Sequence, residues 1–303
     1  MRHPETGKSY IAVVPRQPAF TEIRAAYRKL SADTSWFSMI STDAFHAALD
    51  QYRSEDVVFA HWSPWCVRPA DLPQDRKAMV WAVYSEAYDD DHGKLLPDHQ
   101  RDLRSFVAMA HHFDGIFTHT PWMSERIGAL TGRPTVVLPV GWDPVMGTPN
   151  WEATKTVSAC FHGSYVGRRV ELLPEVYHRC ALDLIWGRWG KDLSDLVDLA
   201  KCVLYIAHSP VHSYSTWRLW QACSASACYV TERGDFWPLT DDLCIPIEPV
   251  TKDNAHVVAE MIREVSFEEA SRKARALHET LRMFTTRSCV ESGMVIGTQR
   301  FSR

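Results

Sequence analysis

The segment FHGSYVGRRVELL, residues Phe161 to Leu173, decides how the second half of this chain folds. An apolar run ends in a turn that contains Gly163 and Gly167, and the pattern then becomes helical. Glycine lets the backbone approach a ligand closely, and a helix N-terminus directs amides and a positive dipole end toward such a turn. Because Arg168 and Arg169 add charge suited to phosphate, we predict an anion site here. An ordinary tight strand–helix turn is the alternative, since neither G-x-G-x-x-G nor a Walker A loop is present.

Strand-like and helix-like segments alternate on both sides of a stretch rich in Pro, Gly and polar residues, VGWDPVMGTPNWEATKT (residues 140–156). Before it, DVVFAHW and AMVWAVY are typical of strands and DLRSFVAMAHHF is typical of a helix. After it, the alternation restarts with VSACF. Strands that alternate with helices predict parallel sheets. We therefore predict an α/β protein with two Rossmann-like domains facing a cleft, residues 1–143 and residues 144–284, with the site at the carboxyl ends of the strands.

The composition is that of a globular protein. The chain has 303 residues, a formal net charge of −4 and 23% charged residues, so nothing draws it as a whole to nucleic acid or anionic membranes. Eight cysteines without C-x-x-C spacing argue against zinc and favour buried thiols. No signal-peptide core is present, and no run approaches the roughly 18 apolar residues of a membrane helix. We expect a cytoplasmic protein without a membrane partner; the sequence does not set its oligomeric state.

A second segment, CVLYIAHSPVHSYSTWRLWQACSASACYVTER (residues 202–233), has the pattern of a strand, a polar loop, a helix and a strand. Ser215 or Thr216 can cap the helix. Arg218 lies in its first turns, and Gln221 follows three residues later on an adjacent face. An anion at this helix start would meet hydroxyls, amides and Arg218 together. The alternatives are a surface salt bridge for Arg218 and a solvated position for Gln221.

These motifs together resemble the GT-B glycosyltransferases, which hold a nucleotide-sugar mainly against the second of two Rossmann-like domains. FHGSYVGRR looks like the F-x-G-S turn of the large retaining group and of the spore-maturation-type relatives. RLWQACSASACYVTE is similar to the family's R-x-x-E-A-x-A-x-G helix and strand, and LPVGWDP is similar to L-P-x-G-x-D-P. The resemblance covers roughly residues 79–265. Where the family has two glutamates with seven residues between them, this chain has Ser213 and Gln221, which leaves open whether it is retaining.

The resemblance implies a donor site in the second domain. Its co-substrate would be a nucleotide-diphosphate sugar, with a UDP-sugar as first choice and no permanently bound cofactor. An indole of IWGRWG, Trp186 or Trp189, would stack on the base unless it belongs to the core. No metal is expected, because family members stabilise charge with arginines and helix amides, and we interpret Asp89–Asp91 as a solvated turn. The implied donor-binding residues are Gly163, Ser164, Arg168, Trp186, Ser215, Thr216, Arg218 and, at the ribose, Gln221.

The first domain would then supply the acceptor site and the catalytic base. Glu86 follows a strand and would serve if burial raised its pKa. His119, after another strand, competes because its ordinary pKa is already close to neutrality. For each candidate the alternative is a loop residue with no catalytic role. The acceptor-binding candidates come from two loops that combine aromatic and basic residues: His61, Trp62, Trp65, Arg68 and Trp122.

Aromatic residues among arginines suit base stacking and phosphate contact. They favour a phage-type enzyme, in the host cytoplasm, that glycosylates a hydroxymethylated DNA base after flipping it out of the stack. The negative net charge argues against DNA, and a glycan or small metabolite is the alternative acceptor. A GT-B-type sugar-nucleotide epimerase and a non-catalytic two-lobed binding protein are the rival functions. The family also implies that residues 285–303 cross back to the first domain and pack Val290, Met294 and Ile296 on it.

Overall fold

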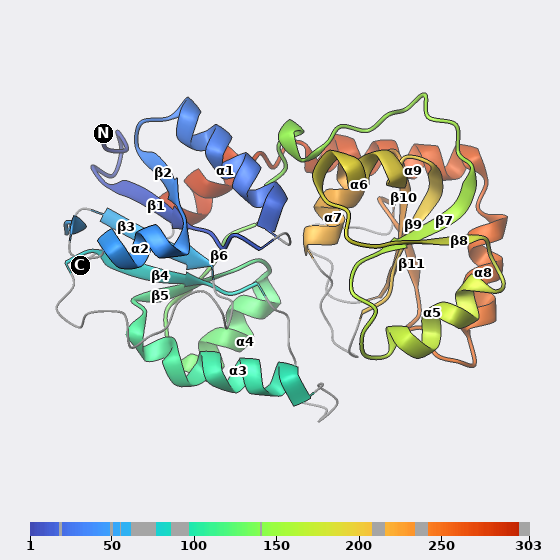
Figure 1. Cartoon of the computed structure of the whole chain (residues 1–303), viewed down its shortest axis with the longest axis horizontal. Coiled ribbons are helices and arrows are strands. Elements are labelled where there is room, and N and C mark those ends of the chain that lie inside the picture. The colour runs from blue at the N-terminus through green and yellow to red at the C-terminus, as the bar shows by residue number, and fades with distance from the viewer. Residues whose placement is uncertain are drawn as a thin grey trace. The chain divides into compact units, whose positions relative to one another are not determined.

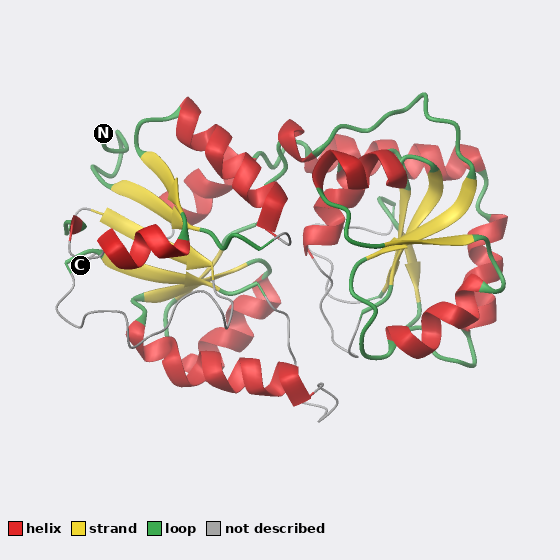
Figure 2. Cartoon of the chain, in the orientation of Figure 1, coloured by secondary structure: helices red, strands yellow, loops and turns green. Residues whose placement is uncertain are grey.

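The computed structural model of the chain forms two compact units (Figure 1). It describes residues 1–17, 20–48, 51–54, 56–61, 77–85, 97–139, 141–207, 216–233 and 242–296. Among these, the residues up to Gly141 and those from Thr285 onward form the first unit, and Trp142 to Phe284 form the second. Both units are α/β, with strands of a parallel sheet between helices (Figure 2). The prediction of two Rossmann-like units is therefore confirmed.

The first unit is built on a parallel sheet in the order β2-β1-β3-β4-β5-β6, counted over the described residues. Its strands are almost continuously apolar because both faces are covered, as a parallel sheet requires. Helices α1 (Thr21–Asp33), α2 (Thr42–Ala48), α3 (Pro97–Met109) and α4 (Pro121–Thr131) connect them, with a short 3₁₀ turn η4 (Ala110–His112) after α3. The strands are β1 (Ser9–Val13), β2 (Phe37–Ile40), β3 (Asp56–His61), β4 (Met79–Val83), β5 (Gly115–Thr118) and β6 (Thr135–Val137).

Local sequence signals fix helix α4. Thr120 precedes it, and its Oγ1 accepts a hydrogen bond from the Met123 amide at 3.2 Å. Pro121 occupies the first helical position, where a missing N–H costs nothing. Gly132 ends the helix at φ 65°, a left-handed conformation that favours glycine. This start holds the β5–α4 turn, and with it His119, in one conformation.

The second unit has a parallel sheet in the order β11-β10-β9-β7-β8. A 3₁₀ turn, η5 (Pro144–Met146), precedes it. Its helices are α5 (Arg169–Tyr177), α6 (Gly190–Val197), α7 (Thr216–Cys223), α8 (Ala255–Glu264) and α9 (Phe267–Leu281). Its strands are β7 (Val157–His162), β8 (Leu182–Ile185), β9 (Ala200–Tyr205), β10 (Cys228–Glu232) and β11 (Ile245–Ile247).

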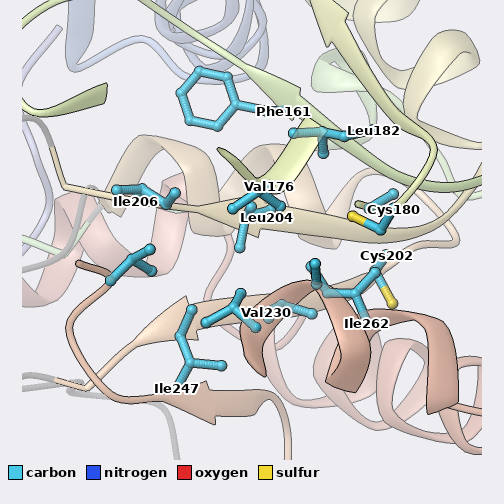
Figure 3. Packing of buried hydrophobic residues seen from close by; sticks show 14 of the residues in the cluster. Phe161, Val176, Cys180, Leu182, Cys202, Leu204, Ile206, Val230, Ile247 and Ile262 are labelled. Atoms are coloured by element: carbon cyan, nitrogen blue, oxygen red, sulfur yellow. The ribbon is translucent and has the colours of Figure 1, made fainter. Parts of the chain in front are cut away.

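One face of this second sheet forms a continuous apolar core with α5 and α8 (Figure 3). Phe161, Leu204 and Val230 come from three strands, and Val176 and Ile262 come from the two helices. Each is at most 1% exposed, so each contributes about 1.5–3 kcal/mol of burial to stability. The described cysteines are buried free thiols, and burial raises the pKa of the Cys180 thiol to about 11. They are packing residues in this fold.

The chain passes from the first unit to the second at Gly141 and returns after Phe284. The Thr286 hydroxyl donates to the Gly141 carbonyl at 3.2 Å, and the Trp142 amide donates to the Phe284 carbonyl at 2.8 Å. A Cβ on Gly141 would lie 2.4 Å from the Thr286 Cα, so only glycine fits this approach. Helix α10 (Thr286–Val290) then packs against α1, and a π-helical turn, η6 (Glu291–Ile296), follows it.

None of the helices that the structure describes is both long enough and apolar enough to cross a lipid bilayer.

Candidate functional site

The order of the strands points to the carboxyl ends of β7 and β9. From β7 the chain moves to β8 on one side and then crosses to β9 on the other. In open parallel sheets, ligands bind outside the carboxyl ends of the strands at such a switch point. We call the carboxyl ends of β7, β8, β9 and β10, with the residues that directly follow each strand, the second-unit edge. It contains both segments that the sequence singled out.

The turn after β7 has the conformation that its glycines predict. Gly163 has φ 125° and Gly167 has φ 59°, values that other residues rarely adopt. Helix α5 begins at Arg169, so its first amides point toward the turn. The Tyr165 hydroxyl donates to the Val170 carbonyl at 2.9 Å and ties the turn to the helix. At the two glycines no Cβ separates the backbone from a neighbouring group, which suits close approach by a ligand.

The two arginines of this turn, which the sequence analysis grouped, lie in different environments. Arg169 is only 2% exposed. Its Nε donates to the Ile206 carbonyl at 2.7 Å, and its Nη1 donates to the Ser164 carbonyl at 3.1 Å and hydroxyl at 3.4 Å. Its guanidinium also lies over the rings of Phe161 and Tyr205. Arg169 therefore joins the ends of β7 and β9 across the switch point.

Arg168 is bound by an acidic residue that sequence reasoning missed. Its Nη1 donates to Oε2 of Glu232 at 3.0 Å, its Nη2 lies 2.8 Å from Oε1, and Nη2 also donates to the Val250 carbonyl. Glu232 is the last residue of β10 and is 6% exposed. The one sequence signal for it was a charged residue at the end of an otherwise apolar strand, CYVTE.

Beyond β8, an aromatic pair lies at the same edge. Trp186 directly follows the strand and is 48% exposed, whereas Trp189 is half-buried just before α6. The ring of Tyr165 lies edge-on to Trp186, with centroids 5.5 Å apart and planes at 71°. An exposed indole with a second ring beside it offers a surface on which a nucleobase can stack. Of the two tryptophans, Trp186 has the free face.

The remaining donor candidates belong to the segment around α7. The helix begins at Thr216, and Gln221 is half-buried in its second half. Arg218 lies in its first turn; the side chains of Thr216 and Arg218 are outside the described part of the structure, as is Ser215 altogether. Gly163, Ser164, Arg168 and Trp186 are brought together with the end of β9, from which the chain leads on to α7.

The first sheet also has a switch point, between β1 and β3. We call the carboxyl ends of β3, β4 and β5, with the residues that directly follow, the first-unit edge. His61 is the last residue of β3, is 1% exposed, and finds no hydrogen-bond partner for either ring nitrogen among the described residues. The rings of Phe20 and Tyr27 lie about 6 Å from it. Burial, with a smaller contribution from nearby His119, lowers the pKa of His61 to about 3.

His119 directly follows β5 and is 2% exposed. Its Nδ1 lies 2.8 Å from the Leu138 carbonyl, so Nδ1 donates and Nε2 carries the lone pair. Burial lowers the pKa of His119 to about 4, although the bond to Leu138 raises it. Burial therefore moves the pKa of His119 away from its ordinary value near neutrality, and the sequence does not show how deeply the ring is buried.

Several candidates of the first domain fall outside the described residues: Glu86, Trp62, Trp65, Arg68 and Asp89–Asp91. Trp122 is described, and lies half-buried in the first turn of α4. Within the described ranges, no group of three His, Cys, Asp or Glu side chains is placed to hold a metal ion. The described part of the first-unit edge therefore contributes two buried, uncharged histidines.

Comparison with known proteins rests on structure alone, because no protein-family model and no curated protein matches the sequence. Sucrose-phosphate synthase from Thermosynechococcus elongatus is similar over 97% of this chain and 98% of its own, with a TM-score of 0.69 and 9% identity. HepE from Anabaena, solved with UDP and glucose, is similar over 94% of this chain and 98% of its own, with a TM-score of 0.63 and 10% identity.

TarM from S. aureus, solved with UDP among its ligands, has a TM-score of 0.60 and 10% identity to this chain. The match covers 86% of this chain but only 58% of TarM, so the chain spans less than two thirds of TarM's length. These proteins are GT-B glycosyltransferases. At such low identity the likeness shows the fold: this chain has the two parallel-sheet α/β units of the GT-B architecture.

Proposed function

We propose that this protein is a glycosyltransferase that moves a sugar from a UDP-sugar to a hydroxyl group of an acceptor. The observation that carries the proposal is the second-unit edge, where a glycine turn, a helix start and the exposed ring of Trp186 surround the switch point. Backbone amides and glycine suit a diphosphate, and an exposed indole suits a base. That HepE was solved with UDP on the same fold supports the choice of nucleotide.

In the proposed complex the diphosphate lies against Gly163 and Ser164 and near the first turn of α7. Arg218 supplies positive charge with a geometry suited to phosphate. Ser215 and Thr216 add hydroxyl donors. Gln221 contacts the ribose through its side-chain amide, which can both donate and accept hydrogen bonds. Trp186 stacks on the uracil.

The transfer breaks the bond between the sugar and the diphosphate, and the acceptor hydroxyl forms the new bond and loses its proton. Arg218 and the backbone amides stabilise the negative charge on the leaving diphosphate. We propose Glu86 as the base that takes the proton in an inverting reaction. His119, with its lowered pKa, is the weaker alternative. In a retaining reaction the departing phosphate itself would take the proton.

For the acceptor, the hypothesis that follows from the sequence is a hydroxymethylated base in DNA. It is supported by the composition of the Trp62–Arg68 segment and by Trp122, and opposed by the net charge of −4. A glycan or a small metabolite competes for the same role. All three acceptors present a hydroxyl group, so an assay must supply each of them separately.

The decisive experiment incubates the protein with UDP-sugars alone, with DNA containing hydroxymethylated bases, with a glycan mixture and with small alcohol metabolites. We expect UDP release that depends on one class of acceptor. An altered sugar nucleotide without an acceptor would indicate the epimerase, and UDP binding without turnover would indicate the binding protein. Arg218→Ala should release UDP more slowly than the wild type. Its matched control is Arg179→Ala, because Arg179 is exposed at the opposite, amino end of β8; this control should release UDP at the wild-type rate.

A further inference from the structure

The carboxylate of Glu232 accepts hydrogen bonds from four donor groups at the second-unit edge. Oε1 accepts from the Val250 amide at 2.6 Å and pairs with Nη2 of Arg168 at 2.8 Å. Oε2 accepts from the Ala207 amide at 2.8 Å and from Nη1 of Arg168 at 3.0 Å. Both carboxylate oxygens are thus occupied by a bidentate arginine and two backbone amides. This arrangement joins segments that are far apart in the chain.

The three partners of Glu232 follow three different strands. Arg168 ends the turn after β7, Ala207 begins the chain that leads from β9 to α7, and Val250 lies between β11 and α8. In the sheet order β11-β10-β9-β7-β8, Glu232 is on the strand between β11 and β9. It therefore reaches in both directions along the edge, and it fixes both segments on which the proposed donor site depends.

The charges of this cluster compensate within the protein. Nη1 and Nη2 of Arg168 both contact the carboxylate of Glu232, and Nη2 also donates to the Val250 carbonyl. The Arg168 side chain is 19% exposed. A guanidinium held in this way brings no net charge to a ligand, because the adjacent carboxylate would repel the diphosphate that the arginine attracts. The role of the pair must then be geometric.

We propose that Glu232 is a positioning residue of the donor site and that Arg168 acts through it, rather than as a direct phosphate ligand. The pair keeps the glycine turn and the start of the β9–α7 connection in the conformation that receives the donor. This inference rests on the proposed function, because it concerns the same site. If Glu232 is a positioning residue, removing its negative charge should weaken UDP binding. If Arg168 instead binds the phosphate directly, the same change should leave UDP binding equal or make it tighter.

The test is UDP titration by calorimetry of the wild type, Glu232→Gln and Arg168→Lys. Glutamine keeps the shape but places an NH₂ group where a carboxylate oxygen accepted two bonds. We expect UDP affinity to fall at least tenfold in Glu232→Gln, although the change removes a negative charge. Lysine keeps the charge of Arg168 but offers one nitrogen in place of the planar fork that contacts both Glu232 oxygens and the Val250 carbonyl, so Arg168→Lys should lose a similar factor. Equal or tighter UDP binding by Glu232→Gln, or near-normal binding by Arg168→Lys, would overturn the proposal.

Two further variants separate positioning from general destabilisation. Ile262→Ala removes a fully buried side chain of α8 in the same unit, away from the edge; it should lower the unfolding temperature yet leave UDP affinity unchanged. If Glu232→Gln does not fold, Glu232→Asp takes its place, since the shorter carboxylate keeps the charge and loses part of the reach; unchanged UDP affinity in it would count against the proposal. Absence of UDP binding by the wild type would instead refute the proposed function, so the two failures are distinguishable.

Discussion

The carboxyl edges of the two sheets hold their polar groups in opposite ways. At the first-unit edge, His61 and His119 are deeply buried, and burial lowers the pKa of both rings to well below neutrality. At the second-unit edge, the guanidinium of Arg168 faces the carboxylate of Glu232 at hydrogen-bond distance. Among the described residues, the first-unit edge therefore contains two buried neutral rings, whereas the second-unit edge contains a pair of opposite charges that compensate each other.

This difference is consistent with the proposal that the two substrates bind to different units, the acceptor to the first and the donor to the second. The hydroxyl group that receives the sugar is uncharged, and a neutral imidazole can donate and accept hydrogen bonds. A diphosphate donor needs amides, glycine and cations, which the second unit supplies along its edge.

The largest effect is expected from Glu86→Gln. The substitution keeps the shape and removes the base, so turnover should fall by about 10²- to 10⁴-fold. Donor affinity should stay nearly intact, because the proposed donor site lies in the second unit. Steady-state kinetics with UDP titration measures both quantities. Near-normal turnover would exclude Glu86, and His119→Gln would then be the variant to measure; if both variants stay active, the retaining reaction is favoured.

The next effect is on acid stability, and it should be confined to the first unit. His61 and His119 have lowered pKa values when folded, about 3 and about 4, against an ordinary value of 6.5. The unfolded state therefore binds more protons below pH 6.5, so the stability present above that pH is lost as the pH falls. At pH 5, about 1.5 units below the ordinary value, each histidine should lower the free energy of unfolding by about 2 kcal/mol, because each unit corresponds to about 1.36 kcal/mol.

Hydrogen exchange at pH 7 and pH 5 measures this loss separately in each unit. Protection of β3, β4 and β5 should fall more than that of β7, β9 and β10 after correction for the intrinsic exchange rate. In His61→Phe the difference should shrink, since phenylalanine fits among the rings of Phe20 and Tyr27 and does not titrate. An equal acid response of both units would contradict the contrast between the two edges.

The fold could be predicted from the sequence because its signals are local. The alternation of apolar strands with amphipathic helices gave the two α/β units, and Gly163 and Gly167 marked a turn that adopts the expected positive φ values. The environment of the charged groups could not be predicted in this way. Arg168 pairs with Glu232, 64 residues later, and only the strand order brings them together. The pKa of His119 likewise depends on burial by distant segments.

A smaller effect should follow from Arg218→Ala. Loss of a charged hydrogen bond to the diphosphate should weaken UDP binding by about 1.5–3 kcal/mol, roughly 10- to 150-fold. Arg179→Ala is the control, as an exposed arginine at the opposite end of the same sheet. Calorimetry at two salt concentrations checks the result, because a direct charge contact weakens as salt is added. Unchanged affinity would remove Arg218 from the donor site.

The smallest effect concerns the nucleobase. Trp186 is 48% exposed beside Tyr165, so its ring has a face on which uracil can stack. Trp186→Ala should weaken UDP binding by about 1–3 kcal/mol, the range for base–aromatic stacking. The same variant should bind pyrophosphate as the wild type does, since pyrophosphate has no base. Trp186→Phe should recover most of the loss, because it restores an aromatic face. Trp189→Ala, at the half-buried indole nearby, is the matched control and should leave UDP affinity unchanged. If the effects at Trp186 and Trp189 were reversed, the base would stack on the second indole of this loop; if neither variant changed UDP affinity, the nucleobase would bind elsewhere on the second-unit edge.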